Sequence, residues 1–176
     1  MIKDRKMRLL SSEDGMDYYL FSPSLFRLYF ENRRDDAVHR HSVTHLLHMV
    51  VYLLRGGYNI LYLSKNDEII SYFVYTKCKD WIVSGSKKND CYTIFLWTFP
   101  KYRNQGMATR MAKFLLRNAG ISFGSFYKTI AKENESSIAV AEKSGFVKIG
   151  EANKIGLLHT IVPAEKGDCL LYRFTN

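Results

Sequence analysis

The stretch Thr93-Ile-Phe-Leu-Trp-Thr-Phe-Pro100-Lys-Tyr-Arg103-Asn-Gln-Gly106-Met-Ala108 combines the end of a strand, a short turn and the start of a helix. Cys91 to Phe99 is rich in β-branched and aromatic residues and is followed by Pro100, which predicts a strand. Met107 to Asn118 has a helical pattern that Gly120 ends. We therefore expect a strand to lead through a tight turn into a helix whose first residues are small.

The turn itself has the features of a phosphate-binding site. Backbone N–H groups at the start of a helix lack intrahelical acceptors, and the helix dipole adds partial positive charge there. Gly106 and Ala108 leave room for a pyrophosphate to approach the backbone, and Arg103 can add a charge-assisted contact. An ordinary strand–turn–helix corner, in which Gly106 only permits the bend, explains this turn equally well.

A second stretch further along the chain makes the pattern more specific. Ile130-Ala-Lys-Glu-Asn134-Glu-Ser-Ser137 leads into a predicted helix, Glu135 to Lys143, which is followed by Ser144-Gly-Phe146. Together with Pro100-Lys-Tyr-Arg103-Asn-Gln-Gly106-Met-Ala108, it resembles the GNAT acetyltransferases. Their phosphate loop reads Arg/Gln-x-x-Gly-x-Gly/Ala, and later come Asn-x-x-Ser/Ala and Lys/Arg-x-Gly-Phe. The resemblance covers Tyr58 to Phe146 well, the first 57 residues poorly, and the rest by strand pattern only.

The resemblance implies an α/β (α+β) fold in a single acyl-CoA N-acyltransferase domain over residues 1–176. Its central sheet would be mostly antiparallel, splayed between two parallel strands, and flanked by helices. The strands that end at Phe99 and near Ile130 should separate, which would leave backbone groups of Leu96 and Thr98 unpaired. In the family, the pantetheine arm of coenzyme A fills that gap like an added strand.

Acetyl-CoA is therefore the implied cosubstrate, with no metal. The backbone amide of Leu96 would polarise the thioester carbonyl. Phe146 would lie in the core, and Lys143 would be either a solvated charge at the end of a helix or a ligand. The implied cofactor-binding residues are Leu96, Thr98, Arg103, Asn104, Gln105, Gly106, Met107, Ala108, Asn134 and Ser137.

Two positions depart from the family pattern. Members often place a Tyr seven residues after the Asn to protonate the departing thiolate, and here that position is Ala141. Many keep a Glu on the strand before the phosphate loop as general base, and no Glu lies between Cys91 and Phe99. The general acid and base therefore stay unassigned, and water-mediated deprotonation would suit this gap. We expect direct acetyl transfer to a primary amine of a small molecule or peptide, or alternatively a non-catalytic CoA-binding sensor or scaffold.

The remaining pattern predicts helices before strands. Ser22 to Arg34 reads as a helix with Pro23 at its first position, and Val43 to Arg55 as a second helix ended by Gly56-Gly57. Short β-rich segments, the first two joined as a hairpin across Lys65-Asn-Asp67, predict the other strands: Tyr58 to Leu63, Glu68 to Thr76, Ser125 to Ile130, Phe146 to Ile149 and Cys169 to Phe174.

Three histidines lie on one face of the second predicted helix. His41, His45 and His48 share this face with Tyr52, whereas the apolar residues Val43, Leu46, Leu47, Val50 and Leu54 lie opposite. A solvated polar face, the lining of an acceptor groove and a zinc site are all compatible with the spacing. Because no Cys or carboxylate completes a ligand set, we predict no metal here. His159 could also reach this groove, although the sequence favours a structural histidine with its hydrogen bonds satisfied.

Charge and cysteine content narrow the classes of partner. The chain has 26 Lys and Arg against 17 Asp and Glu, a formal charge of +9, which favours anionic partners such as a nucleotide cofactor. The basic residues are scattered, which does not favour nucleic acid. Three cysteines without CxxC spacing, a charged N-terminus, and an apolar run from Leu46 to Leu54 interrupted by His48 predict a cytoplasmic protein without membrane insertion. Oligomeric state stays open.

Overall fold

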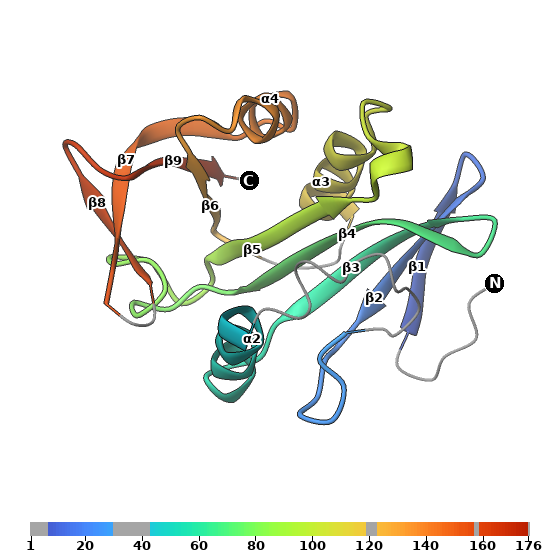
Figure 1. Ribbon diagram of the computed structural model, residues 1–176, viewed down its shortest axis with the longest axis horizontal. Coiled ribbons are helices and arrows are strands. Elements are labelled where there is room, and N and C mark those ends of the chain that lie inside the picture. Colours follow the sequence, from blue (N-terminus) through green and yellow to red (C-terminus); the bar gives the residue numbers. More distant parts are fainter. Residues whose placement is uncertain (1–6, 30–42, 119–122, 157–158, 176) are drawn as a thin grey trace.

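The computed structural model describes residues 7–29, 43–118, 123–156 and 159–175. Its strands form one nine-stranded sheet in the order β1-β2-β3-β4-β5-β6-β9-β7-β8 (Figure 1). The strands are β1 (Met7–Glu13), β2 (Met16–Phe21), β3 (Asn59–Lys65), β4 (Glu68–Lys77), β5 (Cys91–Thr98), β6 (Ser125–Ala131), β7 (Val147–Ile155), β8 (Thr160–Ala164) and β9 (Cys169–Thr175). The described helices are α2 (Val43–Leu54), α3 (Met107–Asn118), α4 (Glu135–Lys143) and the 3₁₀ turn η2 (Pro100–Tyr102).

One pair of strands differs from the rest of the sheet. All other neighbours pair antiparallel, whereas β5 and β6 are parallel. Their pairing is limited to Cys91 with Phe126 and Tyr92 with Tyr127, although β5 continues to Thr98 and β6 to Ala131. The two strands therefore separate beyond this point, and the predicted mostly antiparallel sheet with a splayed parallel pair is confirmed.

The helices cover opposite faces of the sheet. Helices α3 and α4 lie together on one face, and α2 lies on the other (Figure 1). On the α3/α4 face, Met111 and Phe114 of α3 pack with Phe73 of β4 in a core rich in aromatic rings. On the α2 face, Met49 is fully buried against the strands. Both faces of the central strands are thus covered, which explains why β3 and β4 read as nearly continuous apolar runs.

The N-terminal part corrects the sequence prediction. The chain begins with a hairpin, β1 and β2, joined at Asp14-Gly15, where both residues have positive φ. The described part of the predicted helix Ser22 to Arg34 is not helical: Ser24 and Arg27 exchange backbone hydrogen bonds of 3.0 and 2.9 Å across a tight turn. Residues 30–34 lie outside the described residues. Pro at a favourable position was a weak signal, and the turn chemistry of this segment overrode it.

Most of the remaining predictions are confirmed, with differences at the C-terminal end. The predicted helices Met107 to Asn118 and Glu135 to Lys143 are α3 and α4, and the predicted helix from Val43 is α2. Strand β7 extends to Ile155, well past the predicted end at Ile149. Strand β8 was missed because Pro163 interrupts it, and proline is tolerated at this outer edge of the sheet.

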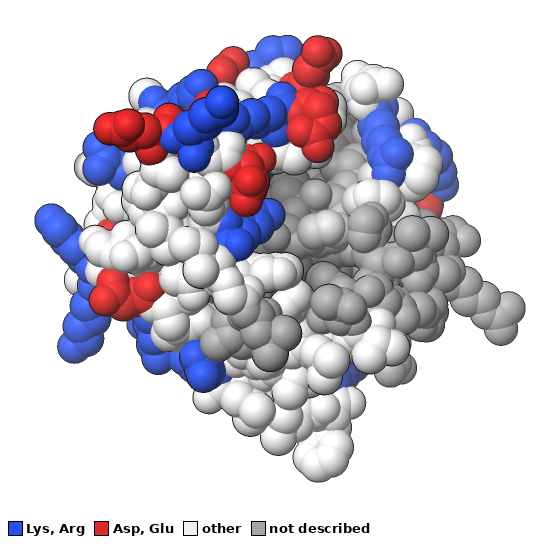
Figure 2. All heavy atoms as spheres, turned by 60° about the vertical axis from the view of Figure 1, so that its left-hand side comes forward, with Lys and Arg blue, Asp and Glu red and all other residues white. Residues whose placement is uncertain are grey.

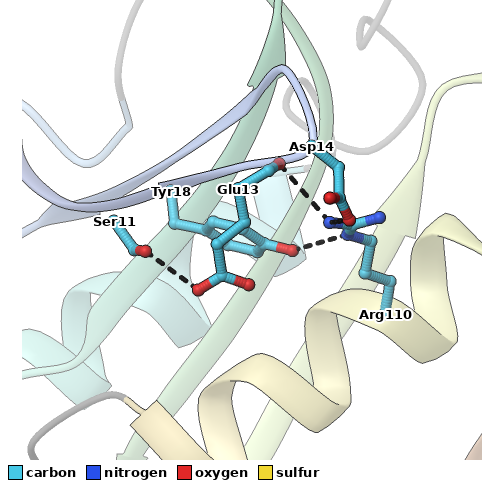
Figure 3. Close-up of polar contacts among 5 residues, drawn as sticks. All are labelled: Ser11, Glu13, Asp14, Tyr18 and Arg110. Atoms are coloured by element: carbon cyan, nitrogen blue, oxygen red, sulfur yellow. Dashed lines mark hydrogen bonds and ion pairs between the residues drawn. The ribbon is translucent and has the colours of Figure 1, made fainter.

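Helix α3 is tied to the N-terminal hairpin by one arginine. Arg110 Nε donates to the Tyr18 hydroxyl at 2.9 Å, and Arg110 Nη2 forms an ion pair with Asp14 at 2.6 Å (Figure 3). The Tyr18 ring also stacks on Phe114 of the same helix with centroids 3.7 Å apart. The hairpin therefore holds the first half of α3 in place beside β5.

Candidate functional site

The separation of β5 and β6 opens a cavity of about 810 Å³. Strand β5, the turn after it, the start of α3, strand β6 and the inner side of α4 all line it. Nine of the ten residues predicted from the two motifs are among its lining residues: Leu96, Thr98, Arg103, Asn104, Gly106, Met107, Ala108, Asn134 and Ser137. The tenth, Gln105, lies outside the lining, and its side-chain amide donates to the Lys101 carbonyl at 3.0 Å.

The edge of β5 that faces this cavity offers backbone groups to a ligand. On the opposite edge, Phe99 N donates to Ile70 O at 3.1 Å, and the Trp97 carbonyl accepts from the Ser71 hydroxyl. Successive residues of a strand direct their backbone groups to alternate edges. The backbone groups of Leu96 and Thr98 therefore point toward the cavity, as the motif analysis expected.

Arg103 changes part of that expectation. Its Nε donates to the Thr98 carbonyl at 3.1 Å, and its guanidinium lies over the Trp97 ring, 4.5 Å from the centroid. The prediction that the Thr98 carbonyl is unpaired is therefore wrong, because this side chain satisfies it. Arg103 still lines the cavity, so its remaining N–H groups stay on the side where an anion would approach.

The turn before α3 has an unusual backbone. Asn104 and Gly106 both have positive φ, 60° and 75°, which the tight connection from η2 into α3 requires. Arg110 N donates to Gly106 O, so the helix starts at this glycine. The N–H groups of Met107, Ala108 and Thr109 then have no acceptor within the helix, and these residues line the cavity. A Cβ placed on Gly106 meets no protein atom within 4 Å, so the space before this turn is open.

The α4 wall of the cavity is fixed by a helix cap. Asn134 Oδ1 accepts from Ser137 N at 3.1 Å and from the Ser136 hydroxyl at 3.0 Å. The Asn-x-x-Ser motif is thus first an N-cap, which places the start of α4 against the cavity. Phe146 is buried in the core, as predicted, and Lys143 is exposed at the last turn while lining the cavity.

The closed end of the cavity carries polar groups that the motif analysis missed. Tyr92 belongs to the last pair of residues that joins β5 and β6, and its hydroxyl shares a hydrogen bond of 2.8 Å with the hydroxyl of Thr129 on β6. Burial raises the pKa of Tyr92 well above its ordinary value, so this phenol stays protonated. On the other face of the same strands, Thr93 and Lys128 are buried and line the cavity. The missed signal was a lysine at an inward position of a strand, between the buried Phe126 and Ile130.

The α2 face of the splay is rich in aromatic rings. Tyr52 of α2 and Trp81 have centroids 5.5 Å apart, and Arg55 lies over the Trp81 ring at 5.2 Å. His48 and His159 lie side by side, with ring centroids 4.8 Å apart. Burial raises the pKa of Tyr52 to about 12, with a smaller contribution from Cys78.

This arrangement changes the interpretation of the histidine helix. The side that carries His48 and Tyr52 packs toward the sheet, whereas Val43, Leu47 and Leu54 are the exposed residues. A plain solvated face is therefore wrong for His48 and Tyr52. His41 lies outside the described residues, as does the side chain of His45. In the part of the chain that the structure describes, no three His, Cys, Asp or Glu side chains are grouped as metal ligands.

The described residues on the face that Figure 2 shows form no continuous basic tract. Lys and Arg side chains on this face are interspersed with Asp and Glu (Figure 2). None of the described helices is long and apolar enough to span a membrane.

Comparison with known proteins identifies the family. The model of the acetyltransferase (GNAT) family matches residues 20–146, which is more than half of the chain. The chain therefore belongs to the GNAT acetyltransferase family. No curated protein matches the sequence significantly.

Solved structures agree with the fold. An uncharacterized protein from Bacillus halodurans matches with a TM-score of 0.65 at 12% identity, over 98% of this chain and 92% of that one. An IAA acetyltransferase from Bacillus cereus matches with a TM-score of 0.59 at 9% identity, over 90% and 99%. A GNAT family acetyltransferase from Elizabethkingia anophelis, with acetyl-CoA bound, matches with a TM-score of 0.58 at 15% identity, over 93% and 100%. These identities are low, so the likeness concerns the fold.

Proposed function

We propose that this chain transfers an acetyl group from acetyl-CoA directly to a primary amine of a small molecule or peptide. The open edge of β5, which runs without a break into the N-terminus of α3, supports this proposal most directly. An elongated ligand with an anionic end and an amide-bearing arm matches such a site, because the helix start binds phosphate and the strand edge pairs with amides. Coenzyme A has both parts.

Different residues of the cavity would bind different parts of coenzyme A. The N–H groups of Met107, Ala108 and Thr109 would hold the pyrophosphate, with Arg103 beside them. The backbone of Thr98 and Leu96 would pair with the pantetheine arm, and the Leu96 amide would face the thioester carbonyl. Asn104 and Gln105 would contribute backbone groups of the turn, since the Gln105 side chain is engaged with Lys101.

The amine would approach from the α2 face of the splay. Tyr52 and Trp81 form an aromatic wall there, and His48 and His159 form a second polar one. Aromatic faces attract cations, and an imidazole nitrogen can form a hydrogen bond with an amine, so both walls suit an amine acceptor. The amine would release its proton to solvent, because β5 carries no carboxylate that could accept it. Proximity to the thioester would supply much of the rate.

Thermal unfolding with and without acetyl-CoA tests the donor site. A ligand that binds only the native state stabilises it, so acetyl-CoA at about 100 times its Kd should raise Tm by about 5–10 °C. Absence of any shift at millimolar acetyl-CoA, with folded protein verified by circular dichroism, would contradict the donor site.

Release of CoA thiol from acetyl-CoA in the presence of an amine library tests the transfer itself. We expect at least one class of primary amine to accelerate thiol release above the acceptor-free rate. The competing function, a non-catalytic CoA sensor of the same fold, is favoured by one observation: Ala141, at the position of the usual acid, is buried and carries no proton donor. Binding of CoA without amine-dependent thiol release would support the sensor and contradict transfer.

A further inference from the structure

Lys128 is a buried lysine inside the proposed donor cavity. It lies on β6, is 7% exposed, and lines the cavity together with Val140 of α4. Among the described residues, no hydrogen bond or ion pair satisfies its ammonium group. A buried charge without a partner is costly, so a fold that keeps one usually uses it.

A second orphaned polar group lies next to it. β5 and β6 pair last at Tyr92 and Tyr127, so Thr93 and Lys128 are the next residues along each strand, where the two separate. Thr93 is 4% exposed, and its Oγ1 has no hydrogen-bond partner within the described chain. Both residues line the cavity. An ammonium and a hydroxyl therefore both lie where the two strands separate, and neither has a hydrogen-bond partner among the described residues.

The groups around Lys128 do not neutralise it. Its register partner on β9, Tyr172, donates its hydroxyl to Glu142 at 3.2 Å. Cys91 precedes Thr93 on β5, and Lys143 on α4 is a second cation on the cavity wall. No carboxylate among the described residues contacts Lys128, and burial lowers its pKa to about 8. This is close to the pKa of a thiol, about 8.5.

We propose that Lys128 is the proton donor to the CoA thiolate that leaves during acetyl transfer, with the Thr93 hydroxyl as a second polar group at the same end of the cavity. The inference rests on the proposed function. The open strand edge runs from the α3 N-terminus past Thr98 and Leu96 to Thr93, so a donor whose phosphates lie at α3 has its sulfur toward the closed end. Lys128 lies at that end.

The proton balance is closed. The acceptor nitrogen bonds to the acyl carbon while the carbon–sulfur bond breaks, and the sulfur keeps the electron pair. The Lys128 ammonium gives that sulfur a proton, and the resulting neutral amine takes up the proton that the new amide nitrogen loses. The products are the N-acetylated acceptor and the CoA thiol, and Lys128 is again an ammonium.

This assignment gives the site a proton donor although Ala141 stands where the family often has a Tyr. Ala141 is on α4, is 1% exposed and faces the core, so no proton donor can come from its position. Lys128 and Val140 line the same cavity from neighbouring elements, β6 and α4. The acid would thus have moved from the helix to the adjacent strand.

The pKa of the CoA thiol in the bound state tests the assignment without an identified acceptor. A cation close to the sulfur lowers a thiol pKa by about 1–3 units. Titration of thiolate ultraviolet absorbance in the CoA complex, with the complex of desulfo-CoA as baseline, reads this value. The buried cysteines interfere little, because burial raises the pKa of Cys78 and Cys91 to about 11 and 12.

Three variants separate the outcomes. Lys128→Met should raise the pKa of the bound CoA thiol, which makes this thiol at least about tenfold less acidic than in the native protein. Lys113→Met removes an exposed lysine of α3 and has the same net charge as Lys128→Met. Its bound CoA thiol should have the same pKa as in the native protein. Thr93→Val should give a smaller change in the same direction. Once an acceptor is known, Lys128→Met should also lower kcat about a hundredfold.

The possible failures are distinct. If the native protein does not bind CoA, the proposed function fails first. If Lys128→Met binds CoA and its bound thiol has the native pKa, the function survives and the role of Lys128 is overturned. If Lys128→Met does not bind CoA at all, Lys128→Gln provides the same titration, and a native thiol pKa there counts equally against the proposal.

Discussion

The two faces of the sheet at the splay are built in different ways. On the α3/α4 face, the cavity is formed by the β5 edge and the turn at Gly106, which are contiguous in the chain, and by the start of α4, which is a separate local motif. On the α2 face, the aromatic and histidine walls combine Tyr52, Trp81 and His159, which come from segments far apart in the sequence. One face offers mainly backbone groups, and the other offers side chains.

This difference has a functional consequence. Backbone donors at a strand edge and a helix start recognise any phosphate-bearing, amide-bearing arm, and their geometry depends on the fold more than on individual side chains. Recognition by side chains from separate elements can change with single substitutions. We therefore expect the α3/α4 face to determine the acyl donor and the α2 face to determine the acceptor.

The largest expected effect is on the donor side, in Gly106→Glu. A carboxylate before the helix start would occupy the space proposed for the pyrophosphate. Placing these two negative charges side by side costs several kcal/mol. CoA affinity, measured by calorimetry, should fall at least about a thousandfold.

Gly85→Glu is the matched control for this variant. Gly85 and Gly106 have nearly equal φ, 77° and 75°, and a Cβ at either meets no atom within 4 Å. The backbone strain of the two substitutions is therefore the same, and Gly85 lies outside the cavity lining. An equal loss of affinity in both variants, or none in either, would remove the phosphate role from the Gly106 turn.

The cavity on the α3/α4 face was also the part of the structure whose lining residues the sequence predicted well. The turn around Gly106 and the cap at Asn134 are local features, so residue spacing determines them, and nine of the ten predicted residues line the cavity. The interaction of Arg103 with Thr98 and Trp97 was not predictable, because it depends on how the turn folds back on β5.

The acceptor side could not be predicted in the same way. The proximity of His48 to His159 depends on tertiary packing between α2 and the segment before β8, which no local pattern encodes. The N-terminal hairpin did leave a local signal, because Asp-Gly at a tight turn is typical of hairpins. It was missed because β1 is an outer strand whose side chains are mostly exposed, so its alternation is weak.

The next largest effect is on the free energy of unfolding, and it concerns Lys128. A lysine pKa lowered from 10.5 to about 8 means that the native state binds this proton less tightly than the unfolded state does. At pH 7 the buried charge therefore destabilises the ligand-free protein, by about 3 kcal/mol. Lys128→Met should be more stable than the native protein at pH 7, by thermal or urea unfolding.

The sign of the pH dependence follows from the same linkage. Between pH 8 and about 10.5 the unfolded state holds more protons at this site, so native stability rises with pH. The advantage of Lys128→Met should therefore shrink above pH 8 and vanish near pH 10.5. A stability difference that is independent of pH over this range would show that Lys128 is not a buried charge.

Substitutions of the two tryptophans, Trp81 and Trp97, should have smaller effects. Trp81→Leu removes the aromatic wall on the acceptor side and should raise the acceptor KM about tenfold, the scale of an aromatic contact, with CoA affinity unchanged. Trp97→Leu removes the ring under Arg103 and should instead weaken CoA binding severalfold. If Trp81→Leu weakened CoA binding and Trp97→Leu raised the acceptor KM, the assignment of the two faces would be reversed.

The smallest effects are expected from tyrosines near the splay. Tyr52→Phe, Tyr92→Phe and Tyr102→Phe should each lower kcat only a few-fold, and none by more than about a hundredfold, the low end of acid–base contributions. A thiolate leaves readily because thiols titrate near pH 8.5, and a good donor needs a similar pKa. Burial raises the pKa of Tyr52 to about 12 and that of Tyr92 further, and the Tyr92 hydroxyl is already bonded to Thr129. Lys128, with a pKa of about 8, is much closer to the thiol. The measurement is kcat at saturating acetyl-CoA and acceptor, and a thousandfold loss at one tyrosine, with CoA affinity unchanged, would move the acid from Lys128 to that residue.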